Sequence, residues 1–113
     1  MYLHIPVHFI TIYLEPNNKR DTDRTMKQLL HIVSSVQARL PSSKFVIMGD
    51  FNERTLECTS ALAGKGLKAL ILEGTSTHNK GGHLDQVFSN LQLIRWEKQK
   101  HQFTDHDTFR VWV

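Results

Sequence analysis

The first part of the chain alternates between apolar residues and residues of other kinds. Its apolar residues recur at every second position, with one phase slip near residues 8 and 9: Leu3, Ile5, Val7, Ile10, Ile12 and Leu14. Successive side chains of a strand point to opposite faces, so this pattern predicts a strand, or two strands joined by a bend. Pro16 and Asn17 follow with turn chemistry, which predicts a loop.

A helical pattern comes next. Asp21 or Thr22 can cap its first turn, and Pro41 ends the run. Between these bounds the chain predicts one long helix, because its apolar residues fall at helical spacing: Met26, Leu29, Leu30, Val33, Val36 and Leu40.

The rest of the chain has the character of short strands and one short helix. Residues 45–48 are continuously apolar, which indicates a strand buried on both faces. Residues 55–63 predict a short helix closed by Gly64 or Gly66. Four further segments are typical of strands, the second and third joined near Ser89 and Asn90: 67–72, 84–89, 91–96 and 109–113.

This order of elements predicts an α/β fold with a mixed sheet and one long helix. Five or six strands would form one sheet, and the helix would cover one of its faces. The other face is then left to a second sheet or to a partner. A length of 113 residues fits a single domain.

The composition of the chain limits its cellular compartment and the kinds of partner that it could bind. Cys58 is its only cysteine, which excludes an internal disulfide and a thiolate zinc cage and favours an intracellular compartment, the nucleus being one candidate. No apolar run is long enough to span a membrane, and the opening segment lacks the pattern of a signal peptide. The net charge of +3 suits a polyanionic partner, although the basic residues are scattered along the sequence. Four of the seven histidines lie in patterns that favour structural or solvated roles: His4, His8, His31 and His101.

The first candidate site is the segment Gly49-Asp50-Phe51-Asn52, which directly follows the buried strand. In extended geometry Asp50 and Asn52 point to the same side, while Phe51 anchors the segment in the core. The carboxylate suits a hard cation or an attacking water, and the carboxamide can donate to a phosphate oxygen. The alternative is a structural Asp-Asn turn after a strand.

Two further clusters follow, HLDQVF at 83–88 and TDH at 104–106. Asp85 lies on an apolar strand, where a buried carboxylate requires a partner, and His106 is the obvious one. Such a pair fixes the imidazole tautomer for proton transfer or transition-state stabilisation, and the adjacent Asp105 is a candidate metal ligand. The alternatives are a surface charge at Asp85 and a solvated loop at residues 105–106.

Taken together, these motifs closely resemble those of the endonuclease/exonuclease/phosphatase superfamily, which includes pancreatic DNase, apurinic endonucleases and the endonucleases of LINE-type retrotransposons. GDFN, HLDQVF and TDH match three family motifs in order, and residues 12–17 resemble the family's tyrosine-bearing strand and loop with one extra residue. The resemblance implies that residues 1–113 are the C-terminal half of a four-layered α/β sandwich, the DNase-like fold.

The resemblance also implies roles for individual residues. Asp50 and Asn52 would activate the water and contact the scissile phosphate, which Tyr13 and Thr77 would also contact. Asp85 would orient His106, and His106 would stabilise the charge that develops on the phosphate. The implied cofactor is Mg²⁺ or Mn²⁺, held by Asp50 and Asp105.

The family's main metal-binding glutamate and an early asparagine belong to an N-terminal half that these residues do not include. We therefore expect metal-dependent phosphodiester hydrolysis, with DNA as the favoured substrate, that is incomplete in this chain alone. A homodimer or another polypeptide would cover the exposed sheet face. Two alternatives stay open: a non-catalytic binding or scaffold module, and a phosphatase or sphingomyelinase of the same fold.

Overall fold

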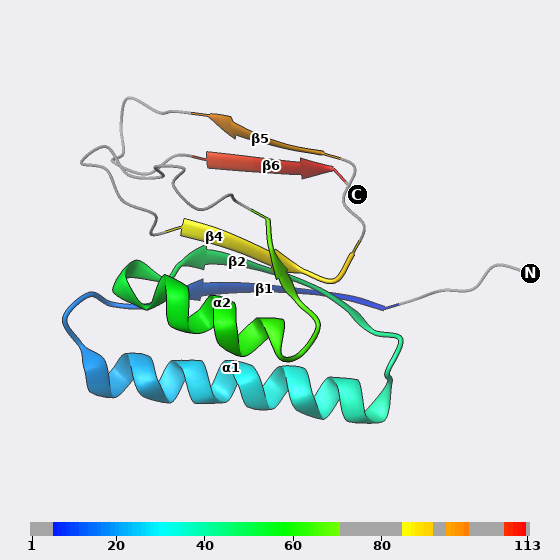
Figure 1. Ribbon diagram of the computed structural model, residues 1–113, viewed down its shortest axis with the longest axis horizontal. Coiled ribbons are helices and arrows are strands. Elements are labelled where there is room, and N and C mark those ends of the chain that lie inside the picture. Colours follow the sequence, from blue (N-terminus) through cyan, green and yellow to red (C-terminus); the bar gives the residue numbers. More distant parts are fainter. Residues whose placement is uncertain (1–5, 71–84, 92–94, 100–107, 113) are drawn as a thin grey trace, which may run out of the picture.

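The computed structural model of the chain describes residues 6–70, 85–91, 95–99 and 108–112, the last two ranges by their backbone (Figure 1). The α/β class, the mixed sheet and the single long helix are confirmed. The described elements are β1 Val7–Tyr13, α1 Lys19–Arg39, β2 Lys44–Asp50, the 3-10 turn η1 Asn52–Arg54, α2 Thr55–Ala63, β3 Lys68–Ala69, β4 Asp85–Ser89, β5 Arg95–Gln99 and β6 Thr108–Trp112.

The strands form two sheets, where the sequence pattern predicted one. The larger sheet has four strands in the order β1-β2-β4-β3, with β1 parallel to β2 and β4 antiparallel to both of its neighbours. Strands β5 and β6 pair with each other, and Figure 1 draws them on the side of the larger sheet away from α1. Strand β5 also lies later than the predicted segment 91–96. Pattern alone gives strand character but not the pairing partner, which explains the error.

Helix α1 is the crossover that joins the two parallel strands. Parallel neighbours need such a connection, and a crossover helix packs back onto the sheet. Here Leu29 and Val33 of α1 enter one buried cluster with Phe45 and Ile47 of β2. Leu62 of α2 belongs to the same cluster, so both helices cover the same face of the sheet.

The start of α1 differs from the prediction. The helix begins at Lys19, and its cap is Asn18, whose side-chain oxygen accepts the backbone N–H of Asp21 at 3.3 Å. Asp21 and Thr22 therefore lie in the first turn. Asparagine caps helices as well as aspartate does, and it stands earlier in the chain. The predicted end is confirmed, with Leu40 as the last capping residue before Pro41.

Helix α2 matches its predicted bounds, and both candidate glycines take part in its end. Gly64 is the C-cap, and Gly66 has a φ of +83°, a left-handed conformation that favours glycine. The N–H of Leu67 donates to the carbonyl of Leu62 at 3.0 Å, and Gly66 donates to Ala63 at 3.0 Å. These two bonds define a Schellman motif, which Leu62 and Leu67 close with a buried apolar contact.

The sheet face opposite the helices is covered in part. Val46 and Val87 are 1% and 3% exposed and form a second buried cluster on that face, together with Met48, Leu70 and Leu91. This face is therefore covered at β2 and β4. At β1 it is exposed, where Phe9 is 67% exposed.

Single residues support the other sequence inferences. His8 stacks on Phe45 with ring centroids 5.2 Å apart, a structural role, and His31 is exposed on α1. His4 and His101 lie outside the described residues. Burial raises the pKa of the Cys58 thiol to about 11, so this cysteine is a poor nucleophile at neutral pH. No described helix is long and apolar enough to cross a membrane.

Replacing Phe88 by alanine should lower the free energy of unfolding by about 3–5 kcal/mol, because a fully buried aromatic ring leaves a cavity when it is removed. Phe88 is 0% exposed, and its ring meets that of Phe51 edge-on at 5.1 Å. Urea unfolding followed by circular dichroism measures the change. The control is Leu56→Ala on α2, which is 68% exposed and should cost less than about 0.5 kcal/mol. If both variants lose the same free energy of unfolding, Phe88 is not part of the buried core.

Candidate functional site

The strand register brings three of the predicted site residues into one row. Tyr13 is the register partner of Asp50 in the parallel pair, and Asp50 is the partner of Asp85 in the antiparallel pair. Neighbouring strands lie about 4.8 Å apart, so the row spans about 10 Å. It is formed by the last residues of β1 and β2 and the first residue of β4.

All three side chains of the row belong to the face that points away from the helices. Asp50 alternates in phase with Val46 and Met48, and Asp85 with Val87, all of which pack on that face. Tyr13 is in phase with the exposed Phe9. Because the side-chain period of a strand is two, the tyrosine and both carboxylates point to the same side.

Two carboxylates in one register pair repel each other unless a cationic group compensates them. Asp50 and Asp85 are both only partly buried. Both carboxylates therefore lie at one end of the sheet, where solvent can reach them.

The segment after Asp50 turns, where an extended course was expected. Phe51 has αR dihedral angles and is fully buried, as predicted, and Asn52 has a φ of +46° at the start of η1. The Oδ1 atom of Asp50 accepts the backbone N–H of Asn52 at 2.9 Å. This local bond competes successfully with the strand, and asparagine tolerates the left-handed conformation. The backbone is thus that of the Asp-Asn turn, with the Asp50 carboxylate held in place by it.

Two hydrogen bonds attach the end of β1 to this turn. The N–H of Leu14 donates to the carbonyl of Asp50 at 2.9 Å, and the Asn52 carboxamide donates to the carbonyl of Leu14. Leu14 itself is buried in the core. The position of the exposed Tyr13 next to Asp50 is therefore fixed by its neighbour in sequence.

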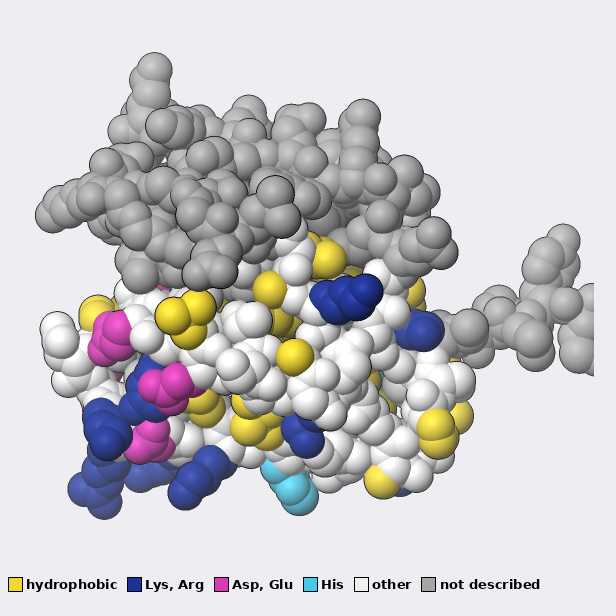
Figure 2. Space-filling model, viewed as in Figure 1, with side chains coloured by type: hydrophobic (Ala, Val, Ile, Leu, Met, Phe, Trp, Pro, Cys, Tyr) yellow, Lys and Arg dark blue, Asp and Glu magenta, His cyan; other side chains and the backbone are white. Residues whose placement is uncertain are grey.

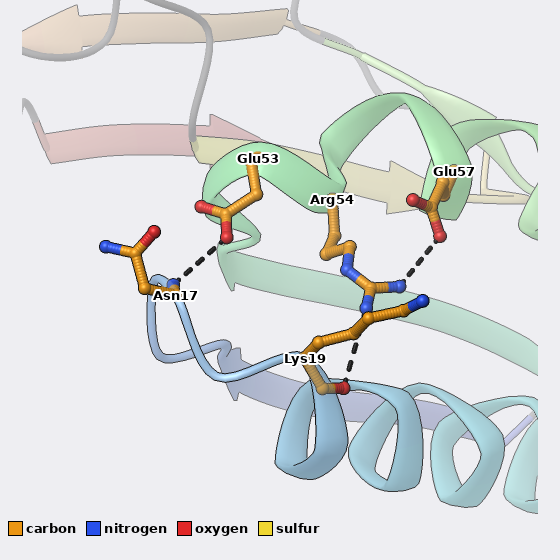
Figure 3. Close-up of a pocket in the computed structure, with 5 residues that line it drawn as sticks. All are labelled: Asn17, Lys19, Glu53, Arg54 and Glu57. Atoms are coloured by element: carbon orange, nitrogen blue, oxygen red, sulfur yellow. Dashed lines mark hydrogen bonds and ion pairs between the residues drawn. The ribbon is translucent and has the colours of Figure 1, made fainter.

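Arg54 anchors the turn to α1, and sequence reasoning missed it. Its guanidinium contacts the Asp23 carboxylate at 2.7 Å and that of Glu57 at 2.9 Å, and it donates to the carbonyl of Lys19 at 3.5 Å (Figure 3 draws the last two contacts). The hydrogen bond that Arg54 donates to the Asp23 carboxylate is the main cause that raises the pKa of Arg54, although desolvation opposes it. Only its place directly after the GDFN-Glu run marked this arginine in the sequence.

A cavity of about 380 Å³ opens beside this arginine, and Figure 3 shows the side chains that line it. Glu53 and Asn17 both line the cavity, and the Glu53 carboxylate accepts the backbone N–H of Asn17 at 3.1 Å. That bond connects η1 to the loop after β1, which begins directly after Tyr13.

Three predicted site residues, Thr77, Asp105 and His106, lie outside the described residues. The pairing of Asp85 with His106 therefore stays a prediction. Within the described ranges, no three residues among His, Cys, Asp and Glu gather as metal ligands would. A site here has Tyr13, Asp50, Asn52 and Asp85 as its described members.

Comparison of the chain with protein-family models, with curated proteins and with solved structures finds no match. The class that the structure defines is a small α/β domain with a four-stranded mixed sheet and two helices.

Gly49 sets the distance between β1 and β2 next to the row. A Cβ atom added at Gly49 would lie 1.8 Å from the carbonyl oxygen of Ile12, far inside contact distance. We expect Gly49→Ala to push the two strands apart and to destabilise the domain by about 1–3 kcal/mol, measured by urea unfolding. The control is Gly64→Ala, where the nearest atom is 3.4 Å away and alanine should be neutral or slightly stabilising. Indistinguishable midpoints would refute the close approach.

Proposed function

We propose that this domain supplies catalytic residues for metal-dependent hydrolysis of phosphodiester bonds in DNA. The observation that carries the proposal is the row Tyr13, Asp50 and Asp85, which three separate strands contribute to one sheet face. On this proposal the sheet and its helices would be half of a four-layered α/β sandwich. The order of the GDFN, HLDQVF and TDH motifs supports the same assignment.

The described residues suit distinct steps of such a reaction. Asp50, whose carboxylate is oriented by the Asn52 N–H at 2.9 Å, would position the attacking water and accept its proton. The exposed hydroxyl of Tyr13 and the second N–H of the Asn52 carboxamide would donate to phosphate oxygens, as would Thr77. Asp85 would hold His106 in the tautomer that stabilises the charge on the phosphate.

The residues fit a hard divalent cation in kind, though not in number. Mg²⁺ and Mn²⁺ prefer carboxylate oxygens, which Asp50 provides and which Asp105 would add. When bound, such an ion supplies positive charge to the phosphate oxygens during hydrolysis. Because two carboxylates are few for a stable magnesium site, we expect weak activity from the chain alone and more when a partner adds an acidic ligand.

DNA is the preferred substrate class because α1 places three basic side chains on one side of its N-terminal turns. Arg20, Arg24 and Lys27 are exposed and fall at i, i+4 and i+7, so they form one stripe at the N-terminal end of α1. Figure 2 shows Lys and Arg side chains gathered at this end of the molecule, together with acidic ones. Of the acids nearby, Asp23 and Glu57 are already paired with Arg54. The stripe begins one short loop after Tyr13.

A second candidate function is a binding or scaffold module without catalysis. The exposed basic residues on one side of α1 favour it. The basic stripe would then bind nucleic acid while the row served only the turn. A small phosphoester, as in the phosphatase alternative, has less use for a stripe on a neighbouring helix.

Nicking of supercoiled plasmid in Mg²⁺ or Mn²⁺, beside an EDTA control, tests catalysis. We expect metal-dependent nicking that Asp50→Asn or His106→Ala lowers by at least about 100-fold, since each removes a group that acts in the transition state. The control Asp21→Asn removes an exposed carboxylate at the same end of the sheet and should change the rate less than about twofold. Nicking that persists in EDTA or in the Asp50→Asn variant would contradict the catalytic assignment. DNA binding without nicking would favour the binding module.

Salt dependence of DNA binding tests the stripe separately. The double variant Arg20→Ser/Arg24→Ser should weaken binding to a fluorescent duplex and lower the slope of log affinity against log salt by about 2, because each phosphate contact contributes about 0.9. The double variant Arg39→Ser/Lys68→Ser removes the same charge from exposed residues elsewhere. Fluorescence anisotropy at several salt concentrations measures both. If the two variants behave alike, the stripe has no special role.

A further inference from the structure

The two edges of the four-stranded sheet differ in how they are protected. Edge strand β3 has only two residues and begins with Lys68, which are common protections against pairing with another chain. Edge strand β1 has seven residues, VHFITIY, with no glycine, no proline and no Asp, Glu, Lys or Arg. A long, uncharged edge of β-branched and aromatic residues is a template for pairing with a further strand.

The hydrogen bonds of β1 show which of its backbone groups face that edge. The carbonyl of Pro6 accepts from Lys44 at 3.0 Å, and the N–H of Leu14 donates to Asp50 at 2.9 Å, so even-numbered residues face β2. Backbone groups of successive strand residues point to opposite edges. The odd-numbered residues of β1 therefore direct both N–H and C=O to the free edge, where no described residue pairs with them: Val7, Phe9, Thr11 and Tyr13.

The same residues expose their side chains on the sheet face away from the helices. Val7 is 38%, Phe9 67% and Tyr13 66% exposed. The apolar cluster of Val46 and Val87 covers the neighbouring strands on this face, but it does not extend over β1. The free edge and the uncovered apolar row therefore coincide on one strand.

We propose that β1 pairs antiparallel with β1 of a second copy of this chain, about a two-fold axis at Ile10. In this register Val7 lies opposite Tyr13 of the second copy, and Phe9 lies opposite Thr11. All four opposed pairs then consist of the residues that face the edge, so each exchanges both hydrogen bonds. A shift of the register by one residue would leave these groups without partners.

The strand is its own complement, which favours a second copy over an unrelated strand. Each opposed pair on the exposed face joins an aromatic residue to a β-branched one, a favourable combination across strands. The rings of Phe9 in the two copies become diagonal neighbours, within reach of each other. No ionised pair of like charge is brought together, and the symmetric contact closes on itself.

Sedimentation velocity on the purified chain tests this pairing without reference to catalysis. We expect the mass to approach twice the 13.1 kDa of one chain at about 100 µM, since a small interface dissociates on dilution. Thr11→Pro removes an N–H that faces only the free edge, and Phe9→Lys places charge in the apolar row. Each should weaken dimerisation by roughly tenfold or more. Leu56→Lys is the matched control, because Leu56 is 68% exposed on α2 against 67% for Phe9.

Dimerisation that both β1 variants weaken and Leu56→Lys leaves intact supports the proposal. A chain that stays at 13.1 kDa up to about 200 µM would overturn it, as would β1 variants that dimerise as well as the control. Circular dichroism is the measurement that checks whether each variant is folded. Should Thr11→Pro unfold, Phe9→Lys decides, because its exposed side chain can be replaced without changing the backbone.

Discussion

Strand β2 is buried on both faces and paired along both edges, and the position of every other described element of the larger sheet depends on it. Phe45 and Ile47 pack toward the helices, and Val46 packs toward the opposite cluster. Full burial of one such side chain contributes about 1.5–3 kcal/mol, so this strand is among the last parts of the domain to open. A carboxylate at its end is held by the most stable part of the fold, which a precise site requires.

At the end of β2 the chain passes within three residues, Met48 to Asp50, from the buried core to a candidate site residue. Burial relaxes from Met48 onward, Gly49 lets the carbonyl of Ile12 approach closely, and Asp50 captures the N–H of Asn52. Each feature is unfavourable in a regular strand. Gly49 has no side chain to pack, Asp50 is not apolar, and the backbone after Asp50 is not extended. Local departures of this kind, compensated by the surrounding core, are typical of functional sites.

Features that depend on residues close together in the sequence could be predicted, and features that depend on residues far apart in the sequence could not. The bounds of α2 and the buried segment at residues 45–48 follow from neighbouring residues, and both were predicted. The start of α1 was missed because Asn18 competes with Asp21 and Thr22 for the same capping role. The division into two sheets was missed. Tyr13, Asp50 and Asp85 were assigned to one site, but the register that aligns them was not predicted, because pairing and register join strands far apart in sequence.

Arg54 shows how one buried cation can shape a surface that it does not reach. By binding Asp23 and Glu57 it offsets part of the negative charge that these two carboxylates place beside the basic residues at the start of α1. The same contacts hold η1 against α1, and so hold the turn that carries Asp50. An arginine suits both tasks because its planar fork binds two carboxylates at once and stays charged when buried. The contacts of this one arginine thus connect the turn after Asp50 to the start of α1, a connection that no pattern of neighbouring residues encodes.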